Sequence, residues 1–155
     1  MPQAWRVVKR RLSGNAFDGE GARLYGGRWN SPGRRVVYVS ETRALGTLEV
    51  LAGLQSTSQI PDYVAFGVRF EGSLVTRLDM EELPDGWDAK PPTTKSQGIG
   101  DRWLDNATSA ILKVPSVIVP AESNYLLNPA HPDFRTIEIA EAEDLDLDPR
   151  LFNRP

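Results

Sequence analysis

Apolar residues in the first half of the chain form two short runs that are typical of β-strands. Residues 4–9 and residues 35–39 are rich in valine and aromatic side chains, which favour strands, and the second run predicts a buried strand. The intervening residues 13–33 are rich in glycine, so we expect a loop that bends sharply and carries Arg28.

A helix is expected directly after the second strand. Ser40 is a suitable N-cap residue, and Glu41 would lie in the first turn, where the helix dipole favours a carboxylate. Apolar residues then recur at helical spacing, namely Leu45, Leu48 and Ala52. Glu49 lies on the flank of this stripe rather than opposite it, so we expect its carboxylate to be only partly solvated.

Strict alternation of apolar positions marks the next segment, residues 63–70. Four residues share one phase of this alternation, namely Val64, Phe66, Val68 and Phe70. The pattern predicts a half-buried strand, and residues 73–78 are expected to continue it or to pair with it in an antiparallel sheet. Residues 82–92 are rich in proline and charge and predict an exposed connection.

The third quarter of the chain predicts one helix and then apolar strand segments. Residues 94–108 are expected to be helical, although Gly98 and Gly100 weaken the helix. Residues 110–114 and 116–119 are apolar and are separated by a proline. They predict two short strands with a kink, or one broken edge strand.

The last part of the chain changes from a short strand to an acidic segment. Residues 135–140 are expected to form a further strand, and the acidic residues 141–148 are read as a solvated tail. Residues 1–155 contain no repeat and no long linker. We therefore expect one compact α+β domain with a mixed or antiparallel sheet core and flanking helices.

Composition narrows the classes of function. With 155 residues and 40% hydrophobic side chains, the chain can bury a core without disulfides. The net charge of −3 and the dispersed basic residues argue against a nucleic-acid partner. The absence of cysteine excludes thiolate catalysis and disulfides. The sequence has neither a signal-peptide pattern nor an apolar run near the roughly 20 residues that span a bilayer, so we expect a cytoplasmic protein without a membrane partner.

Several common motifs are missing or incomplete. The sequence contains neither a Gly-x-Gly-x-x-Gly fingerprint between a strand and a helix nor a P-loop. His131 lies in a turn sequence, which favours a structural role over general-base catalysis. Asp144, Asp146 and Asp148 resemble the start of a calcium loop, but proline follows them where such a loop needs glycine. No metal site is therefore expected.

Five polar or aromatic residues remain as candidates, and three of them have two interpretations. Arg28 is either a surface arginine or a ligand-binding one. A partly buried Glu49 carboxylate is costly, so either an arginine pairs with it or a site uses it. Tyr38 is either a core aromatic or a pocket residue. From type and context alone, Ser116 would be a hydroxyl at a strand end, and Asn124 would stabilise a turn.

Taken together, the motifs of this chain resemble those of the RES domain family, toxins of bacterial type II toxin–antitoxin pairs. The resemblance covers nearly the whole chain in order. The motifs that carry it are Trp5-Arg6, Gly27-Arg28-Trp29-Asn30, Val37-Tyr38-Val39-Ser40-Glu41, Leu48-Glu49-Val50-Leu51, Gly100-Asp101-Arg102-Trp103-Leu104, Val114-Pro115-Ser116, Val119-Pro120, Ser123-Asn124-Tyr125-Leu126-Leu127-Asn128-Pro129 and Asp148-Pro149-Arg150-Leu151. Arg28, Glu49 and Ser116 match the arginine, glutamate and serine that give the family its name.

The resemblance implies an ADP-ribosyltransferase-like fold that binds NAD+ as a substrate, without a metal, and breaks its nicotinamide–ribose bond. Arg6 and Arg28 would then bind the pyrophosphate, and Tyr38 would pack against the nicotinamide or its ribose. Glu49 would stabilise the cationic transition state. The cofactor-binding residues would also include Ser116, as a hydrogen-bond partner of a ribose or amide group, and Asn124.

The resemblance leaves the acceptor of the ADP-ribosyl group open. Water would give NAD+ hydrolysis, phosphate would give phosphorolysis, and a host protein side chain would give mono-ADP-ribosylation; we favour NAD+ consumption that arrests growth. The family also implies an Xre-like helix-turn-helix antitoxin that occludes the active site. Two other classes compete: a non-catalytic binding module with a structural Arg28–Glu49 ion pair, and a nuclease toxin, which the net charge disfavours.

Overall fold

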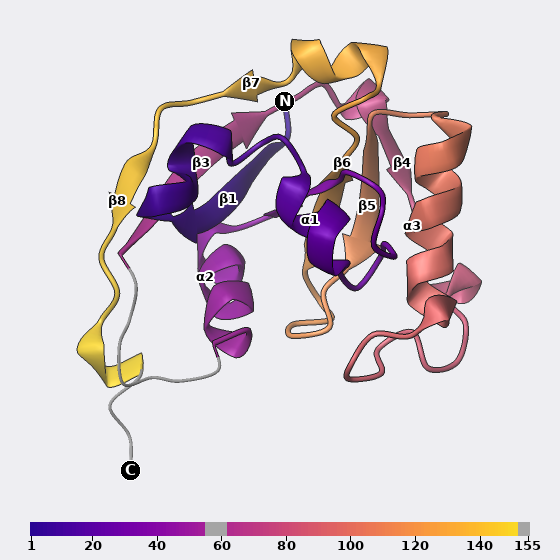
Figure 1. Ribbon diagram of the computed structural model, residues 1–155, viewed down its shortest axis with the longest axis horizontal. Helices are drawn as coiled ribbons and strands as arrows, with labels where there is room; N and C mark the ends of the chain where they lie inside the picture. The colour runs from indigo at the N-terminus through magenta and orange to yellow at the C-terminus, as the bar shows by residue number, and fades with distance from the viewer. Residues whose placement is uncertain (55–61, 152–155) are drawn as a thin grey trace.

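In residues 1–54 and 62–151, which the computed structural model describes, eight strands form one curled sheet (Figure 1). The strand order is β4-β5-β6-β2-β1-β3-β7, and β8 pairs with β3 outside this order. The strands are β1 (Gln3–Lys9), β2 (Val37–Ser40), β3 (Tyr63–Arg69), β4 (Val75–Arg77), β5 (Ile111–Pro115), β6 (Ser123–Leu127), β7 (Glu138–Ile139) and β8 (Glu143–Leu145). The expected α+β fold with a mixed sheet is confirmed.

Three α-helices accompany the sheet in the described part of the chain: α1 (Glu20–Tyr25), α2 (Arg43–Ala52) and α3 (Thr94–Asn106). Helix α2 contacts β1 and β2, whereas α3 lies beside β4 and β5 (Figure 1). Short 3-10 helices cover Arg10–Asn15, Gly72–Leu74, Met80–Glu82, Pro132–Thr136 and Pro149–Leu151. None of the described helices is long and apolar enough to cross a bilayer.

Strand β3 is buried on both faces, whereas its alternating pattern predicted a half-buried strand. Every residue from Tyr63 to Val68 is buried. Val64 and Phe66 pack with Phe17 on one face, and Tyr63 and Ala65 pack with Val50 of α2 on the other. The prediction of a solvent-facing side was wrong because this second face is covered by Val50 of α2 and by Leu145 and Leu147 from the C-terminal region.

Strand β4 does not continue or pair with β3, as residues 73–78 were expected to do. A 3-10 turn over Gly72–Leu74 redirects the chain away from β3. Strand β4 then pairs with β5 in parallel, with Val75 opposite Ile111. The other paired strands are antiparallel, so the sheet is mixed rather than antiparallel.

The connection into α2 differs from the prediction in two ways. The glycine-rich residues 13–33 contain the short helix α1 instead of being only a loop. Ser40 ends β2 instead of capping α2; the N-cap is Thr42, whose Oγ1 accepts a hydrogen bond from the Leu45 amide at 3.0 Å. The predicted helix itself is confirmed.

Helix α3 passes through the two glycines that were expected to weaken it. A side chain at Gly100 would place its Cβ 1.7 Å from the backbone oxygen of Trp29. Glycine therefore lets the loop that carries Trp29 pack directly on the helix, which offsets its low helix propensity. The connection over residues 82–92 contains no buried residue, but it is not fully exposed as expected, because Leu83 and Trp87 pack against the core.

Only the first of the two apolar segments after α3 is a strand. Residues 116–119 turn back instead, because the Ser116 hydroxyl accepts hydrogen bonds from the amides of Ile118 and Val119. The chain then enters β6, which pairs with both β5 and β2. Asn124 therefore lies on a central strand, not in a turn.

The C-terminal region pairs with the sheet more than its composition suggested. Within residues 135–140, only Glu138–Ile139 form a strand, after a 3-10 turn over Pro132–Thr136. The acidic segment is not a free tail, because β8 places Leu145 opposite Tyr63 of β3. The charged residues of β8 are exposed on an edge strand. Their acidic composition therefore does not indicate that this segment pairs with the sheet.

Candidate active site

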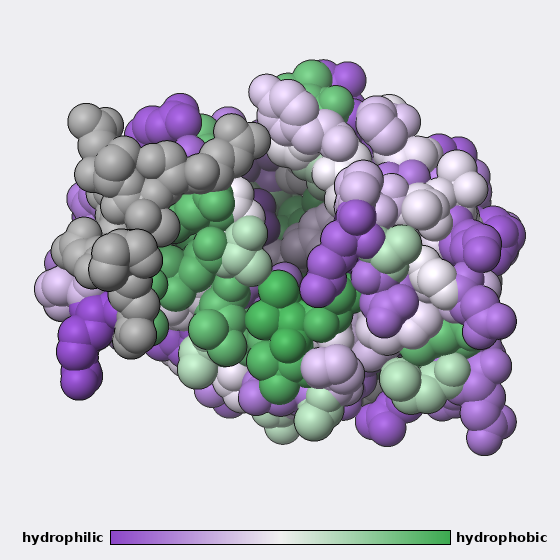
Figure 2. Space-filling model, turned by 90° about the horizontal axis from the view of Figure 1, so that it is seen from below, coloured by the Kyte–Doolittle hydropathy of each residue, from purple (hydrophilic) through white to green (hydrophobic). Residues whose placement is uncertain are grey.

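A cleft of about 1260 Å³ opens between β1, α1, the end of α2 and the residues that precede β6. Figure 2 shows the hollow in the face seen from below, with apolar side chains along part of its rim. Five of the six site residues predicted from the sequence line this cleft: Arg6, Arg28, Tyr38, Glu49 and Asn124. Ser116 is 0% exposed and lies behind Glu49.

Glu49 projects from α2 toward β6, and two neutral donors hold its carboxylate. Its Oε1 accepts hydrogen bonds from Ser116 Oγ at 2.9 Å and from Asn124 Nδ2 at 2.8 Å. Its Oε2 has no partner among the described residues, and no buried side-chain nitrogen or oxygen atom of these residues lacks a partner. The Oε2 atom is therefore accessible from the cleft that Glu49 lines.

Arg28 is anchored by backbone carbonyls and not by a carboxylate. Its Nη1 donates to the Ala89 oxygen and, at 3.2 Å, to the Trp87 oxygen. The Trp87 ring stacks on Trp29, with 5.9 Å between centroids. Partial burial lowers the pKa of Arg28, and Asp88 and Glu49 oppose this shift. The Nε and Nη2 atoms of Arg28 donate to no described residue. Because Arg28 lines the cleft, these donors remain for a ligand there.

Arg6 is held in the same manner on the other side of the cleft. Its Nε donates to the Ala16 oxygen at 2.9 Å, and its Nη1 donates to the Tyr38 oxygen at 3.0 Å. Burial lowers the pKa of Arg6 to about 10, and Asp18 acts in the opposite direction. The guanidinium therefore stays protonated at neutral pH, with Nη2 left for a ligand.

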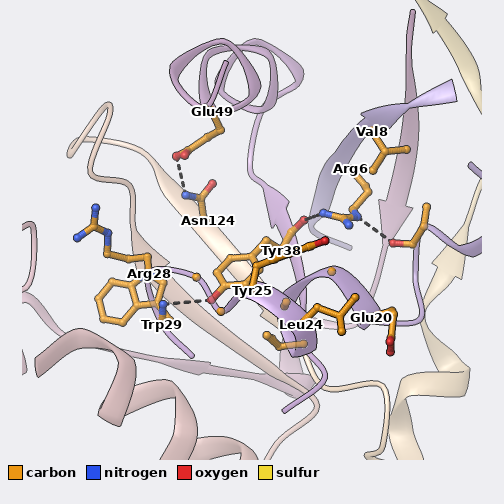
Figure 3. Close-up of a pocket in the computed structure, with 18 of the residues that line it drawn as sticks. Arg6, Val8, Glu20, Leu24, Tyr25, Arg28, Trp29, Tyr38, Glu49 and Asn124 are labelled. Carbon is orange, nitrogen blue, oxygen red and sulfur yellow. Dashed lines mark hydrogen bonds between the residues drawn. The ribbon is translucent and has the colours of Figure 1, made fainter. Parts of the chain in front are cut away.

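Tyr38 lines the cleft with its ring, because its hydroxyl is hydrogen-bonded to two neighbouring residues. The hydroxyl donates to Asn30 Oδ1 at 2.6 Å and accepts from the Trp29 amide at 3.1 Å. Burial is the main cause that raises the pKa of Tyr38, so the phenol is neutral. In Figure 3, Tyr38 lies between Arg6 and Arg28, with Glu49 and Asn124 above it.

Ser116 and Asn124 both act on Glu49 in this structure. The Ser116 hydroxyl donates to Glu49 and accepts from two backbone amides, so its oxygen has no place for a ribose or amide group. Asn124 lines the cleft, and its amide oxygen accepts from Ser40 Oγ at 2.8 Å. No local sequence pattern indicates this contact, because Ser40 and Asn124 meet only through strand pairing.

His131 and the acidic residues Asp144, Asp146 and Asp148, which were considered in the sequence, lie outside the cleft lining. His131 Nδ1 accepts a hydrogen bond from the Asp133 amide at 3.0 Å and caps a 3-10 helix, which confirms its structural interpretation. Within residues 1–54 and 62–151, no group of three or more histidine, aspartate or glutamate side chains is placed to hold a metal ion. The arrangement thus combines a carboxylate, an aromatic face and two guanidinium groups in one cleft.

Known toxins are similar to this chain over almost its whole length. The chain is 35% identical over 148 residues to "Toxin Res" of Yersinia enterocolitica, covering 95% of this chain and 97% of the relative. It is 34% identical over 155 residues to the "Prs ADP-ribosylating toxin" of Sphingobium sp. strain YBL2, covering 97% and 96%. Its fold matches a crystal structure of the M. tuberculosis MbcT-MbcA toxin–antitoxin complex with a TM-score of 0.71 at 18% identity, covering 96% of this chain and 85% of that one. Because the model of the RES domain also matches residues 3–148, the chain belongs to the RES domain family of toxins.

Proposed function

We propose that this toxin cleaves the bond between nicotinamide and ribose in NAD+. The observation that carries the proposal is the Glu49 carboxylate, which enters the cleft with Oε1 fixed and Oε2 open. Positive charge builds on the ribose as the bond breaks, and a preorganised carboxylate stabilises that charge. Glu49 is therefore the proposed catalytic residue.

The two arginines are suited to position the dinucleotide. Each uses part of its guanidinium to bind backbone carbonyls and keeps other donors for the cleft. A planar guanidinium can form paired hydrogen bonds to phosphate oxygens, which a lysine ammonium cannot reproduce. We assign Arg6 and Arg28 to the pyrophosphate, so that the nicotinamide half of NAD+ reaches Tyr38 and Glu49.

The remaining residues would orient the reacting groups. Tyr38 presents its ring for packing against the nicotinamide or its ribose. Ser116 is assigned to position Glu49 rather than to contact the dinucleotide, because its hydroxyl is buried and fully used. Asn124 does both in this proposal: it holds Glu49 and contributes to the cleft wall.

Three acceptors could capture the ribosyl cation: water, phosphate or a protein side chain. We favour NAD+ consumption by hydrolysis or phosphorolysis, since depletion of NAD+ would arrest growth. Mono-ADP-ribosylation of a host protein is the second candidate. It is favoured by the relative in Sphingobium, which is named an ADP-ribosylating toxin and matches nearly the full length of this chain.

We further propose that an antitoxin controls this site. The structural neighbour was solved within a toxin–antitoxin complex, which supports an antitoxin as the partner class. By resemblance to the family, this partner would be an Xre-like helix-turn-helix protein that occludes the cleft. Because the proposed substrate is NAD+, we expect the toxin to act in the cytoplasm.

The competing binding-module hypothesis required an ion pair between Arg28 and Glu49. In the structure, neither residue takes part in an ion pair with a described residue, because carbonyls hold Arg28 and neutral donors hold Glu49. A carboxylate that forms no direct ion pair with a described residue fits a cationic transition state better than a structural pair.

The proposal is tested by measuring nicotinamide release from NAD+ by purified protein freed of any antitoxin. The assay is run with and without phosphate, and then with candidate acceptor proteins. Release that rises with phosphate would identify phosphorolysis, whereas release independent of phosphate would indicate hydrolysis. Release that depends on an added protein would identify transfer.

Glu49→Gln and Glu41→Gln form a matched pair for this assay. Both glutamates are partly buried and accept a hydrogen bond from β6, but Glu41 binds the Ser123 amide and does not line the cleft. We expect activity to be lost only in Glu49→Gln. A folded wild-type protein that releases no nicotinamide under any of these conditions would overturn the proposal.

A further inference from the structure

The hydrogen bonds behind Glu49 continue one residue beyond the site described above. Asn124 Nδ2 donates to Glu49 Oε1 at 2.8 Å, and Asn124 Oδ1 accepts from Ser40 Oγ at 2.8 Å. Ser40 and Asn124 are directly opposite each other in the β2–β6 pair. Three side chains from β2, β6 and α2 thus form one chain of hydrogen bonds, which we call the Ser40 relay.

The chemistry of the relay fixes the orientation of the Asn124 amide. A carboxylate at neutral pH can only accept, so Asn124 must turn its NH2 group toward Glu49. The amide oxygen then faces Ser40, whose hydroxyl can donate to it. The opposite amide orientation would bring two acceptor oxygens together at Glu49 and would also lose the bond from Ser40.

Burial makes this contact effective. Ser40 is 5% exposed, so water competes little for its hydroxyl. Helix α2 reaches Ser40 closely because residue 46 is glycine: a Cβ there would lie 3.0 Å from Val7 Cγ2 and 3.8 Å from Ser40 Oγ. Glu49 is three residues further along α2, so the same close packing brings its carboxylate to Asn124.

We propose that Ser40 is a positioning residue for Glu49, acting through the amide of Asn124. The inference rests on the proposed function, in which Glu49 is the catalytic group. With Asn124 and Ser116 both bound to Oε1, the carboxylate cannot rotate without breaking two hydrogen bonds. The relay therefore keeps Oε2 directed into the cleft. Ser40 does not line the cleft and does not need to contact NAD+.

The first test is steady-state kinetics of Ser40→Ala. We expect kcat to fall about tenfold, because one hydrogen bond of the relay is lost, while KM for NAD+ changes less than about twofold. Ser40→Thr, which restores a hydroxyl, should recover most of kcat. In the Asn124→Ala background, Ser40→Ala should have no further effect on kcat, because the relay is already broken.

Ser109→Ala is the control for a purely structural effect. The Ser109 hydroxyl also makes several hydrogen bonds, to Trp103, Thr76 and the Ile111 oxygen, and it lies outside the cleft lining. Ser109→Ala should lower the melting temperature without lowering kcat. A folded Ser40→Ala protein with unchanged kcat, or effects of Ser40→Ala and Asn124→Ala that simply add, would overturn the inference.

A second readout does not depend on activity. The side-chain NH2 of Asn124, assigned by its loss in Asn124→Ala, should exchange slowly with solvent in the wild-type protein and at least about tenfold faster in Ser40→Ala. An equally fast exchange in both proteins would exclude the relay. If the wild-type protein released no nicotinamide, the proposed function would fail, and the amide signal would still decide whether the relay exists.

Discussion

The carboxylate side and the arginine side of the cleft are held in different ways. Side chains hold Glu49, through Ser116 and Asn124, whereas backbone carbonyls hold Arg6 and Arg28. A carbonyl anchor is present whatever side chain its residue carries, but a hydroxyl or amide anchor depends on residue type. The position of Glu49 should therefore be sensitive to substitutions around it, and the arginines should be sensitive mainly to their own replacement.

The largest expected effect is that of Glu49→Gln. The amide keeps the shape of the side chain but removes the charge that stabilises the ribosyl cation, so kcat should fall about a thousandfold. The melting temperature should stay near that of the wild type, because a glutamine oxygen can still accept from Ser116 and Asn124. Nicotinamide release and thermal unfolding measure the two effects; a folded variant with full turnover would refute the catalytic assignment.

Arg28→Lys is expected to be next in size. A single ammonium cannot bind the carbonyls of Trp87 and Ala89 and also present a planar pair of donors to a phosphate. We expect kcat/KM for NAD+ to fall about 10- to 100-fold, the effect of losing one or two hydrogen bonds to a charged group. Calorimetric titration of NAD+ into this variant should show weaker binding. Unchanged affinity would mean that Arg28 does not contact the dinucleotide.

Ser116→Ala should have a smaller effect on activity and a clear effect on stability. It leaves the amides of Ile118 and Val119 without their acceptor and removes one donor from Glu49. The free energy of unfolding should fall by about 1–3 kcal/mol. By analogy with a single lost hydrogen bond, kcat should fall about tenfold. Urea denaturation and kinetics separate the two; an increase in KM alone would indicate a direct contact of Ser116 with NAD+.

Tyr38→Phe is expected to affect activity least. The ring that faces the cleft is retained, so kcat should change by less than about threefold. The lost hydroxyl leaves Asn30 Oδ1 and the Trp29 amide without a partner, which should cost about 1–3 kcal/mol of stability. Tyr38→Ala, which also removes the ring, should reduce kcat much further. Equal kcat values for the two variants would show that the ring does not orient the substrate.

The sequence predicted the local features of the site better than its long-range contacts. The periodicity of residues 45–52 placed Glu49 on the flank of a helix, and the glycines placed Arg28 on a loop. The role of Asn124 could not be predicted, because it depends on the pairing of β2 with β6, 84 residues apart for the Ser40 contact. Local patterns carry no information about which strands become neighbours.

The difference between local patterns and long-range contacts also explains which elements of the fold were predicted wrongly. Helix α1 has only six residues within a glycine-rich segment, too few to show a helical period. Strand β8 carries acidic residues that are typical of solvated segments, and only its pairing with β3 makes it a strand. The turn after Ser116 depends on a side-chain hydroxyl that accepts two amides, which an apolar run does not indicate.

The most direct test of the central claim is a crystal structure of the Glu49→Gln protein with NAD+. We expect the nicotinamide ribose to lie beside the cleft-facing atom of residue 49, with the pyrophosphate in contact with Arg6 and Arg28 and the Tyr38 ring against the nicotinamide half. A dinucleotide bound in the cleft with its ribose away from residue 49, or bound outside the cleft, would contradict the account.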